Sequence, residues 1–229
     1  MKSTKLVLVV SLMLAVCLSV PLTVQSASNS MSPTPLLSPQ DPPARAAIKT
    51  ADGYMLVWNR PDIHFSILIK GKDIRPLNDT ENVLFQVDGM VFQIQLASVS
   101  EFAPDAKEKK LDDKTILAAH RDWESKYTEE MLRGKLKVES FSTKLSNGAE
   151  ALLWQYDMPE AMKVDAKKQL YLTVVSGDYV MVFNSVVTTK VSEEQARKLL
   201  QDTVATLKTS PDPIDVKKLA LSIRDGVAP

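Results

Sequence analysis

Residues 170–183 read LYLTVVSGDYVMVF and decide the fold. Gly177 and Asp178 separate two runs of apolar and β-branched residues, which predicts a β-hairpin. Alternate residues of a strand point to opposite faces, and here both faces are apolar. They carry Tyr171, Val175, Val180 and Val182 on one side, and Leu170, Leu172, Val174, Met181 and Phe183 on the other. Such a hairpin must be covered on both faces, so we expect it at the centre of a sheet with layers above and below.

A second hairpin is predicted around Asp88 and Gly89, because a type I′ turn needs a positive φ at both of its central positions. The strand pairs that follow from this turn are Val87 with Met90, Phe85 with Phe92, and Val83 with Ile94. All six side chains then share one face. Leu84 and Val91 fall on the other face, where we expect them to be exposed.

Asn147 and Gly148 predict a third hairpin. A two-residue turn at this point opposes Thr143 to Leu152 and Phe141 to Trp154, and it collects five large side chains on one face: Phe141, Leu145, Leu152, Trp154 and Tyr156. Nearer the start of the chain, Tyr54 to Trp58 and Ile63 to Ile69 read as strands that are joined by a turn at residues 59–62.

Two helices are predicted by apolar spacing. The first runs from Asp113 to Arg133 and ends at Gly134, with an apolar stripe made of Ile116, His120, Trp123 and Tyr127. The second begins at a capping box formed by Ser192 and Gln195, and its apolar side carries Ala196, Leu199, Leu200, Thr203, Val204 and Leu207. A short third helix is expected over residues 216–223, before Gly226.

The first 26 residues predict export. Lys2 and Lys5 precede an uncharged run from Leu6 to Val24, and small residues follow at 26–28, which is the pattern of a cleaved secretory signal. We expect cleavage after Ser26. The alternative is an uncleaved membrane anchor, because 19 uncharged residues reach the lower limit for a bilayer span. Residues 27–47 contain five prolines and predict a disordered spacer, which would form a stalk if the leader stays attached.

Composition excludes some classes of function. The chain has 28 basic and 28 acidic side chains, and cleavage removes Lys2 and Lys5 but no acid, which leaves a net charge near −2. This balance argues against nucleic acid as a partner, since phosphate binding needs a positive excess. Cys17 is the only cysteine and lies in the leader, so the exported form has no disulfide and depends on its core for stability.

No catalytic, cofactor-binding or metal-binding residues stand out in the sequence. His64 and His120 are the only histidines, one in a predicted strand and one on a predicted helix, and neither belongs to a metal-binding motif. A metal-dependent or other hydrolase that uses both histidines is the alternative to a non-catalytic protein. We expect no cofactor and no metal.

The order of elements, strands and hairpins followed by a helix, two more hairpins and a closing helix, resembles the α/β/α sandwich of PsbP-type photosystem extrinsic proteins and Mog-type Ran-binding proteins. The resemblance covers residues 54–209. It implies a non-catalytic domain that docks on a larger partner. No motif of those families stands at a defined position here, so no binding residue is carried over.

The sequence therefore predicts an α+β protein with a largely antiparallel sheet built of hairpins and with helices packed on both faces, a three-layer α/β/α sandwich. We expect a signal peptide at 1–26, a spacer at 27–47, one domain at 48–210 and a tail at 211–229. The expected function is an exported, secreted or periplasmic, binding or assembly module of the cell envelope. Its mature form would have no stable membrane span, and a protein or other envelope partner would bind at a strand edge or at the sheet face beside Leu84 and Val91.

Overall fold

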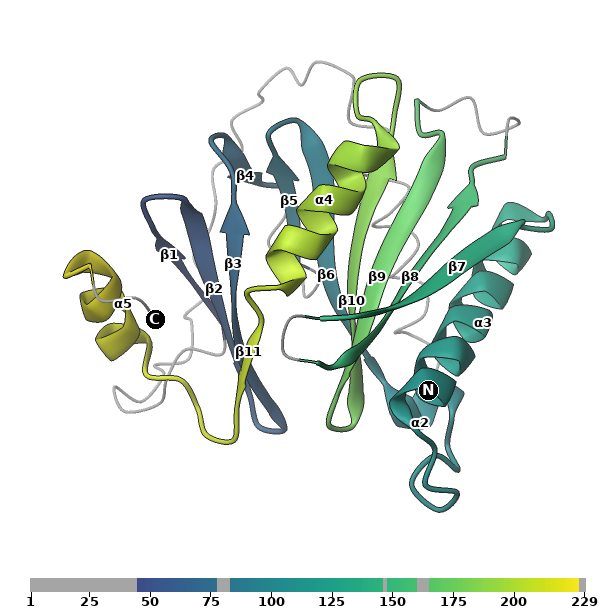
Figure 1. The fold of residues 1–229 in the computed structure, drawn as a ribbon, viewed down its shortest axis with the longest axis horizontal. Coiled ribbons are helices and arrows are strands. Elements are labelled where there is room, and N and C mark those ends of the chain that lie inside the picture. The colour runs from purple at the N-terminus through teal and green to yellow at the C-terminus, as the bar shows by residue number, and fades with distance from the viewer. Residues whose placement is uncertain (1–44, 78–82, 146–147, 160–164, 227–229) are drawn as a thin grey trace, which may run out of the picture.

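The computed structural model describes residues 45–77, 83–145, 148–159 and 165–226, and it shows an α+β protein whose paired strands are all antiparallel (Figure 1). One sheet has four strands in the order β1-β2-β3-β11. Its strands are β1 (Arg45–Lys49), β2 (Gly53–Arg60), β3 (Ile63–Lys70) and β11 (Lys208–Ser210).

A larger sheet has seven strands in the order β4-β5-β6-β10-β9-β8-β7. Its strands are β4 (Ile74–Pro76), β5 (Val83–Val87), β6 (Met90–Ser98), β7 (Val138–Lys144), β8 (Glu150–Asp157), β9 (Lys168–Ser176) and β10 (Tyr179–Val187). The helices of the described part are α2 (Val99–Phe102), α3 (Asp113–Leu132), α4 (Glu193–Val204) and α5 (Val216–Arg224). None of the described helices has both the length and the apolar character that a bilayer span requires.

The hairpin at Gly177 lies in the middle of the larger sheet, as its two apolar faces predict. β10 is the central strand of the seven and β9 is its neighbour. Leu172 and Phe183 belong to a first core, which also takes side chains from β2, β3 and α4. Tyr171 and Val182 belong to a second core, which also takes side chains from α3. Both faces of the hairpin are therefore buried, as the sequence predicts.

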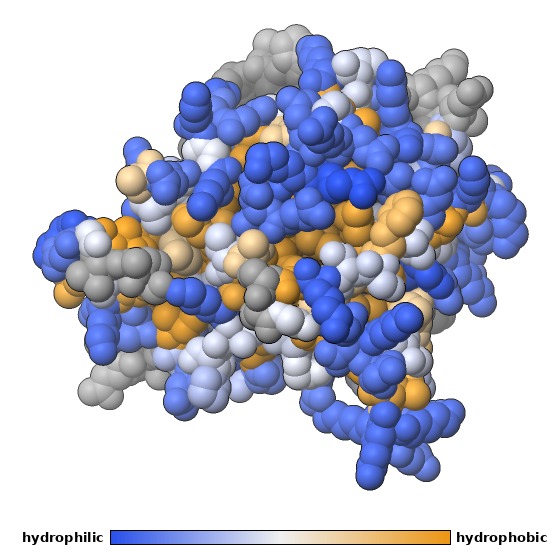
Figure 2. Space-filling view, in the orientation of Figure 1, coloured by the Kyte–Doolittle hydropathy of each residue, from blue (hydrophilic) through white to orange (hydrophobic). Residues whose placement is uncertain are grey.

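The first core differs from the expected arrangement because it lies partly between two sheets. β3 contributes a row of fully covered residues at alternate positions, Phe65, Ile67 and Ile69, which pack with the inner face of the larger sheet. α4 covers the remainder of this face. Figure 2 shows hydrophilic residues over the outer side of α4 and hydrophobic residues beneath it, in agreement with its buried side chains.

The hairpin at Asp88 and Gly89 has the predicted register. Val87 pairs with Met90 and Phe85 with Phe92, and the φ values of Asp88 and Gly89 are 50° and 84°. Positive φ at both positions is the geometry of a type I′ turn, which matches the twist of the flanking strands. The local sequence alone determines this pairing.

The predicted register of the hairpin at Gly148 is wrong by one residue. Phe141 pairs with Leu153 and Thr143 with Ala151, so Phe141 lies on the opposite face from Trp154 and is 48% exposed. The connection has three residues, because the N–H of Leu145 donates to the carbonyl of Ala149 over 2.9 Å. Gly148 is the last residue of this loop. Its φ of 84° is the left-handed conformation that a three-residue loop requires there.

The helix boundaries agree with the sequence except at one cap and at the end of α4 (Glu193–Val204), which stops before the predicted Leu207. α3 begins after Asp112, whose carboxylate accepts from the N–H of Thr115. Its left-handed C-terminal residue is Arg133, with φ 51°, and not the predicted Gly134. α4 has the predicted capping box, and α5 confirms the expected third helix.

The ends of the chain are described only in part. β1 begins at Arg45, so residues 45–47 of the expected spacer form a strand that pairs with β2. This part of the spacer prediction is wrong, because residues 45–47 are held in the sheet by antiparallel backbone pairing with β2. The predicted leader and the rest of the spacer lie outside the described residues. β2 extends further toward the turn than predicted, to Arg60, whereas β3 begins at the predicted Ile63.

Candidate functional site

The structure does not bring the two histidines together. His64 lies on β3, paired with Asn59 of β2 and Ser210 of β11. His120 lies on α3, and its ring packs against Phe102 with centroids 5.2 Å apart. β3 and α3 lie on opposite sides of the molecule (Figure 1). Among the described residues no group of three His, Cys, Asp or Glu side chains could hold a metal ion.

The sheet face beside Leu84 and Val91 is not the exposed surface that the sequence suggests. Leu84 is only 5% exposed, and Val91 is half-buried. Alternation along one hairpin assigns these residues to a face, but it does not reveal what packs over that face. Leu84 instead contributes to the wall of a pocket at the same edge of the sheet.

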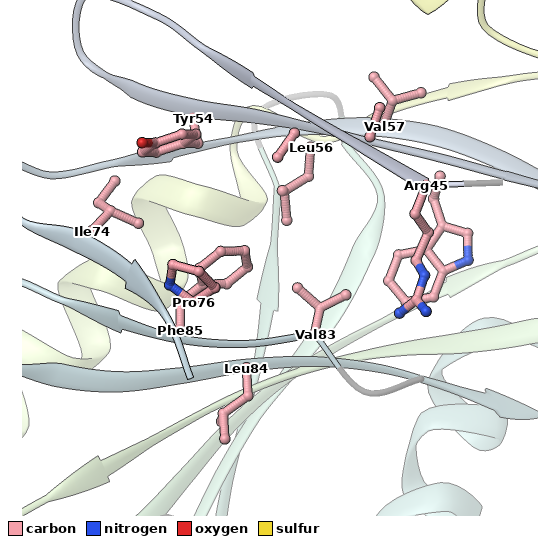
Figure 3. Close-up of a pocket in the computed structure, with 12 residues that line it drawn as sticks. Arg45, Tyr54, Leu56, Val57, Ile74, Pro76, Val83, Leu84 and Phe85 are labelled. Atoms are coloured by element: carbon pink, nitrogen blue, oxygen red, sulfur yellow. The ribbon is translucent and has the colours of Figure 1, made fainter. Parts of the chain in front are cut away.

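This pocket has a volume of about 350 Å³ and opens between the two sheets (Figure 3). Its walls come from β1 and β2 of the smaller sheet and from the outer strands β4 and β5 of the larger one. The residues that line it are mostly apolar: Arg45, Ala46, Ala47, Tyr54, Leu56, Val57, Trp58, Ile74, Pro76, Val83, Leu84 and Phe85.

Strand alternation builds the two long walls. Tyr54, Leu56 and Trp58 occupy every second position of β2, so they share one face of that strand. Val83 and Phe85 do the same on β5, and Figure 3 shows both pointing toward β2 while Leu84 points away from it. Each wall is therefore one apolar face of a strand.

Small side chains on β1 leave the space between these walls unfilled. Ala47 pairs with Leu56 and shares its face of the sheet, so β1 adds only one methyl group to the wall beside Leu56. On the opposite side β4 is only three residues long and ends at Pro76. A short strand and the small side chain of Ala47 thus leave the edge of the sandwich open.

Among the described residues of the lining, Arg45 is the only charged one. Its guanidinium carbon lies 5.5 Å from the centroid of the Trp58 ring, at the distance of a cation–π contact. Trp58 is in turn stacked on Phe65, with ring centroids 5.4 Å apart. The pocket therefore has an apolar interior and a positive charge, held by an aromatic ring, at the first residue of β1.

The chemistry of the lining is that of a binding site. The described residues that line the pocket include no Ser, Cys, His, Asp or Glu, so they supply neither a nucleophile with its base nor a pair of carboxyl groups for acid–base catalysis. Among the described lining residues, Arg45, Tyr54 and Trp58 carry polar side-chain groups. A few polar groups around an apolar concavity are typical of small-molecule sites.

A second group of polar side chains is buried under α3. Burial raises the pKa of Glu124 to about 7 and lowers the pKa of His120 to about 4. The hydroxyl groups of Tyr156 and Tyr171 are 3.4 Å apart, and burial is the main cause that raises the pKa of Tyr156 to about 12. The ring of Tyr171 is stacked on Trp154 with centroids 3.8 Å apart.

These groups are packed inside the second core, which points to a role in stability. His120 lies on the predicted apolar stripe of the helix, whereas Glu124 is a buried residue that the sequence did not indicate. The available signal was its position one turn after His120, on the side of the helix that the stripe predicts to be buried.

Comparison with known proteins reveals similarity at the level of structure. No protein-family model matches the chain, and no curated protein matches it in sequence. The solution structure of cyanobacterial PsbP (CyanoP) from Synechocystis sp. PCC 6803 is similar with a TM-score of 0.41 and 10% identity, over 77% of this chain and 100% of that one. A crystal structure from Bacteroides thetaiotaomicron VPI-5482 is similar with a TM-score of 0.31 and 13% identity, over 71% of this chain and 54% of that one. The resemblance to PsbP-type proteins that the order of elements predicts is thus one of fold.

Proposed function

We propose that this chain is an exported, non-catalytic binding module, and that it holds a small, largely apolar molecule in the pocket between β1–β2 and β4–β5. The observation that carries the proposal is the lining itself, in which strands of two separate sheets turn apolar faces toward an open space of about 350 Å³. Pockets of roughly 300 to 1,000 Å³ with such walls commonly bind small molecules.

The physical basis of binding is the burial of apolar surface. Leu56, Val83 and Phe85 offer hydrocarbon contacts on both sides of the space. Removing apolar surface from water contributes about 25 cal/mol for each Å² that is covered. The scaffold that holds the walls is, we infer, the α/β/α sandwich expected from the sequence, with α3 on the second core and α4 on the first.

Export is part of the proposal and is supported by the leader. The basic residues, the uncharged run and the small residues at 26–28 are the features that signal peptidase substrates share. We place the protein outside the cytoplasm, secreted or periplasmic, with an envelope molecule as its partner. N-terminal sequencing of the exported form should give Ala27 as the first residue, whereas an intact Met1 would indicate an uncleaved anchor.

A substitution that fills the pocket with a larger side chain tests the binding function. Ala47→Trp places a large side chain beside Leu56 without removing any core residue. Ser142→Trp is the matched control, since Ser142 is an exposed residue of the edge strand β7 in the other sheet. The probe is N-phenyl-1-naphthylamine, a neutral aromatic compound that fluoresces in apolar surroundings.

We expect saturable binding of this probe to the wild-type protein and to Ser142→Trp, and at least a tenfold weaker affinity for Ala47→Trp. Circular dichroism and thermal unfolding check that all three proteins are folded. Retained binding by a folded Ala47→Trp protein would exclude the pocket as the site. Absence of saturable binding to the wild-type protein would contradict the proposed function.

A further inference from the structure

We propose that the natural ligand of this pocket is an amphipathic carboxylate, with its apolar chain between the two sheets and its carboxylate at Arg45. The inference rests on the proposed function, because it narrows the class of molecule that the same site holds. It is carried by the position of Arg45, the one charged side chain among the described lining residues, at one end of walls that are mostly apolar.

Arg45 is suited to hold a carboxylate. It opens β1 and pairs with Trp58, so its backbone is fixed at the edge of the sheet. Its guanidinium group lies over the Trp58 ring, which restricts the side chain further. A planar guanidinium has five N–H donors and binds a carboxylate through two parallel hydrogen bonds. These donors allow Arg45 to keep its other contacts while it holds the ligand.

The other described residues of the lining disfavour a ligand with a second charged group. Beyond Arg45 the walls along β2 and β5 present hydrocarbon and aromatic groups, with Leu56 and Phe85 both buried. A charged group that lost its water against these side chains would find no partner of opposite sign there, which is costly. The lining therefore fits one anionic group and an uncharged body.

The length of the pocket favours an extended chain. Trp58, beside Arg45, and Tyr54 both line it, and they stand four residues apart on the same face of β2. At about 3.3 Å for each residue of a strand, this stretch of wall is about 13 Å long. A ligand with its head at Arg45 can thus lay a hydrocarbon chain along Trp58 and Leu56 toward Tyr54.

Two probes with the same chain and different heads test this inference. Decanoate carries the carboxylate, and decan-1-ol lacks the charge. Titration calorimetry below the micellar concentration compares the wild-type protein with Arg45→Gln, which removes the charge. Arg75→Gln is the matched control, because Arg75 is an exposed arginine of β4 that does not line the pocket.

We expect Arg45→Gln to weaken the binding of decanoate about tenfold, as for the loss of a charge-assisted contact. The affinity for decan-1-ol should change less than twofold, and Arg75→Gln should bind both probes like the wild-type protein. Higher salt should weaken the binding of decanoate only, because screening acts on the charge.

The outcomes separate this inference from the proposed function. Equal affinity of the wild-type protein and Arg45→Gln for decanoate would overturn the carboxylate assignment while leaving the apolar site in place. Failure of both probes, together with N-phenyl-1-naphthylamine, to bind the folded wild-type protein would overturn the site itself. Arg45→Lys, which keeps the charge but not the planar fork, should lie between the wild-type protein and Arg45→Gln.

Discussion

Glu124 follows His120 by one helical turn on the buried side of α3, and the two side chains are 6% and 1% exposed. Phe102 of α2 packs against His120, while Tyr156 of β8 and Tyr171 of β9 lie near Glu124, whose charge acts on both hydroxyl groups. Burial disfavours the charged form of each residue, so it raises the pKa of the acid and lowers the pKa of the base. Their effects on stability therefore have opposite dependences on pH.

Glu124→Gln should reveal the contribution of His120. The pKa of His120 is about 4 in the folded chain, against an ordinary value of 6.5 when the chain is unfolded. Its contribution to the free energy of unfolding is complete above pH 6.5 and is lost as the pH falls toward 4. In Glu124→Gln we expect stability to fall between pH 7 and pH 4.5, by on the order of 2 to 3 kcal/mol. Urea unfolding at the two pH values measures this change.

A control variant on the same helix shows that the effect comes from burial. Glu130 is exposed on α3, and Glu130→Gln should keep the pH profile of the wild-type protein. A pH-independent Glu124→Gln protein would show that His120 is not held neutral by its surroundings.

His120→Leu should give the opposite slope. The pKa of Glu124 is about 7 in the folded chain, against an ordinary value of 4.5. Its contribution to the free energy of unfolding is complete below pH 4.5 and is lost as the pH rises to about 7. Between pH 4.5 and pH 7 this variant should lose on the order of 3 kcal/mol. The wild-type protein should vary much less in this range, and a matching slope in the wild-type protein would contradict the assignment.

Gly53→Ala should destabilise the smaller sheet strongly. A Cβ atom at this position would lie 2.0 Å from the carbonyl oxygen of Ile69, and the φ of Gly53 is 155°. Because the clash is with backbone, we expect a loss of about 3 kcal/mol or more. Gly89→Ala is the control, since its φ is also positive but a Cβ atom there meets nothing within 4 Å. It should cost about 1 kcal/mol. Similar losses for both variants in urea unfolding would contradict the steric explanation.

Tyr179→Phe should raise the pKa of Asp62. The hydroxyl group of Tyr179 donates to the Asp62 carboxylate and thereby joins the first residue of β10 to the turn between β2 and β3. This hydrogen bond is the main cause that holds the pKa of Asp62 below its usual value. Carboxyl titration followed by NMR should show the pKa move up in the variant. An unchanged titration would indicate that the contact is absent in solution.

The sequence predicts strand pairing correctly where the turn residues are compatible with only one loop length. Asp88 and Gly89 both take positive φ, so the register from Val83 to Ile94 follows from two residues. Gly148 is compatible with a turn of two or of three residues, and the two choices differ by one position along the whole of β7. The misplaced Phe141 follows from that ambiguity. Its ring lies on the side of α4, with the guanidinium carbon of Arg197 at 5.8 Å from its centroid.

The pocket could not be predicted because no local pattern encodes it. Alternation shows that Leu56 and Phe85 each face an apolar layer, and this much is visible in the sequence. Which layer each strand meets depends on the division of the strands into two sheets, which is a property of the whole chain. The space beside Ala47 is bounded by β1 of the smaller sheet and by β4 of the larger one, which are brought together only when the whole chain folds.

The walls of the pocket belong to different hydrogen-bonded ladders, since β2 pairs within the smaller sheet and β5 within the larger one. A change in the spacing between them alters side-chain contacts but breaks no strand pairing. The distance between the walls is therefore set by the side chains packed between the two sheets, such as Phe65 and Ile67, and not by backbone hydrogen bonds.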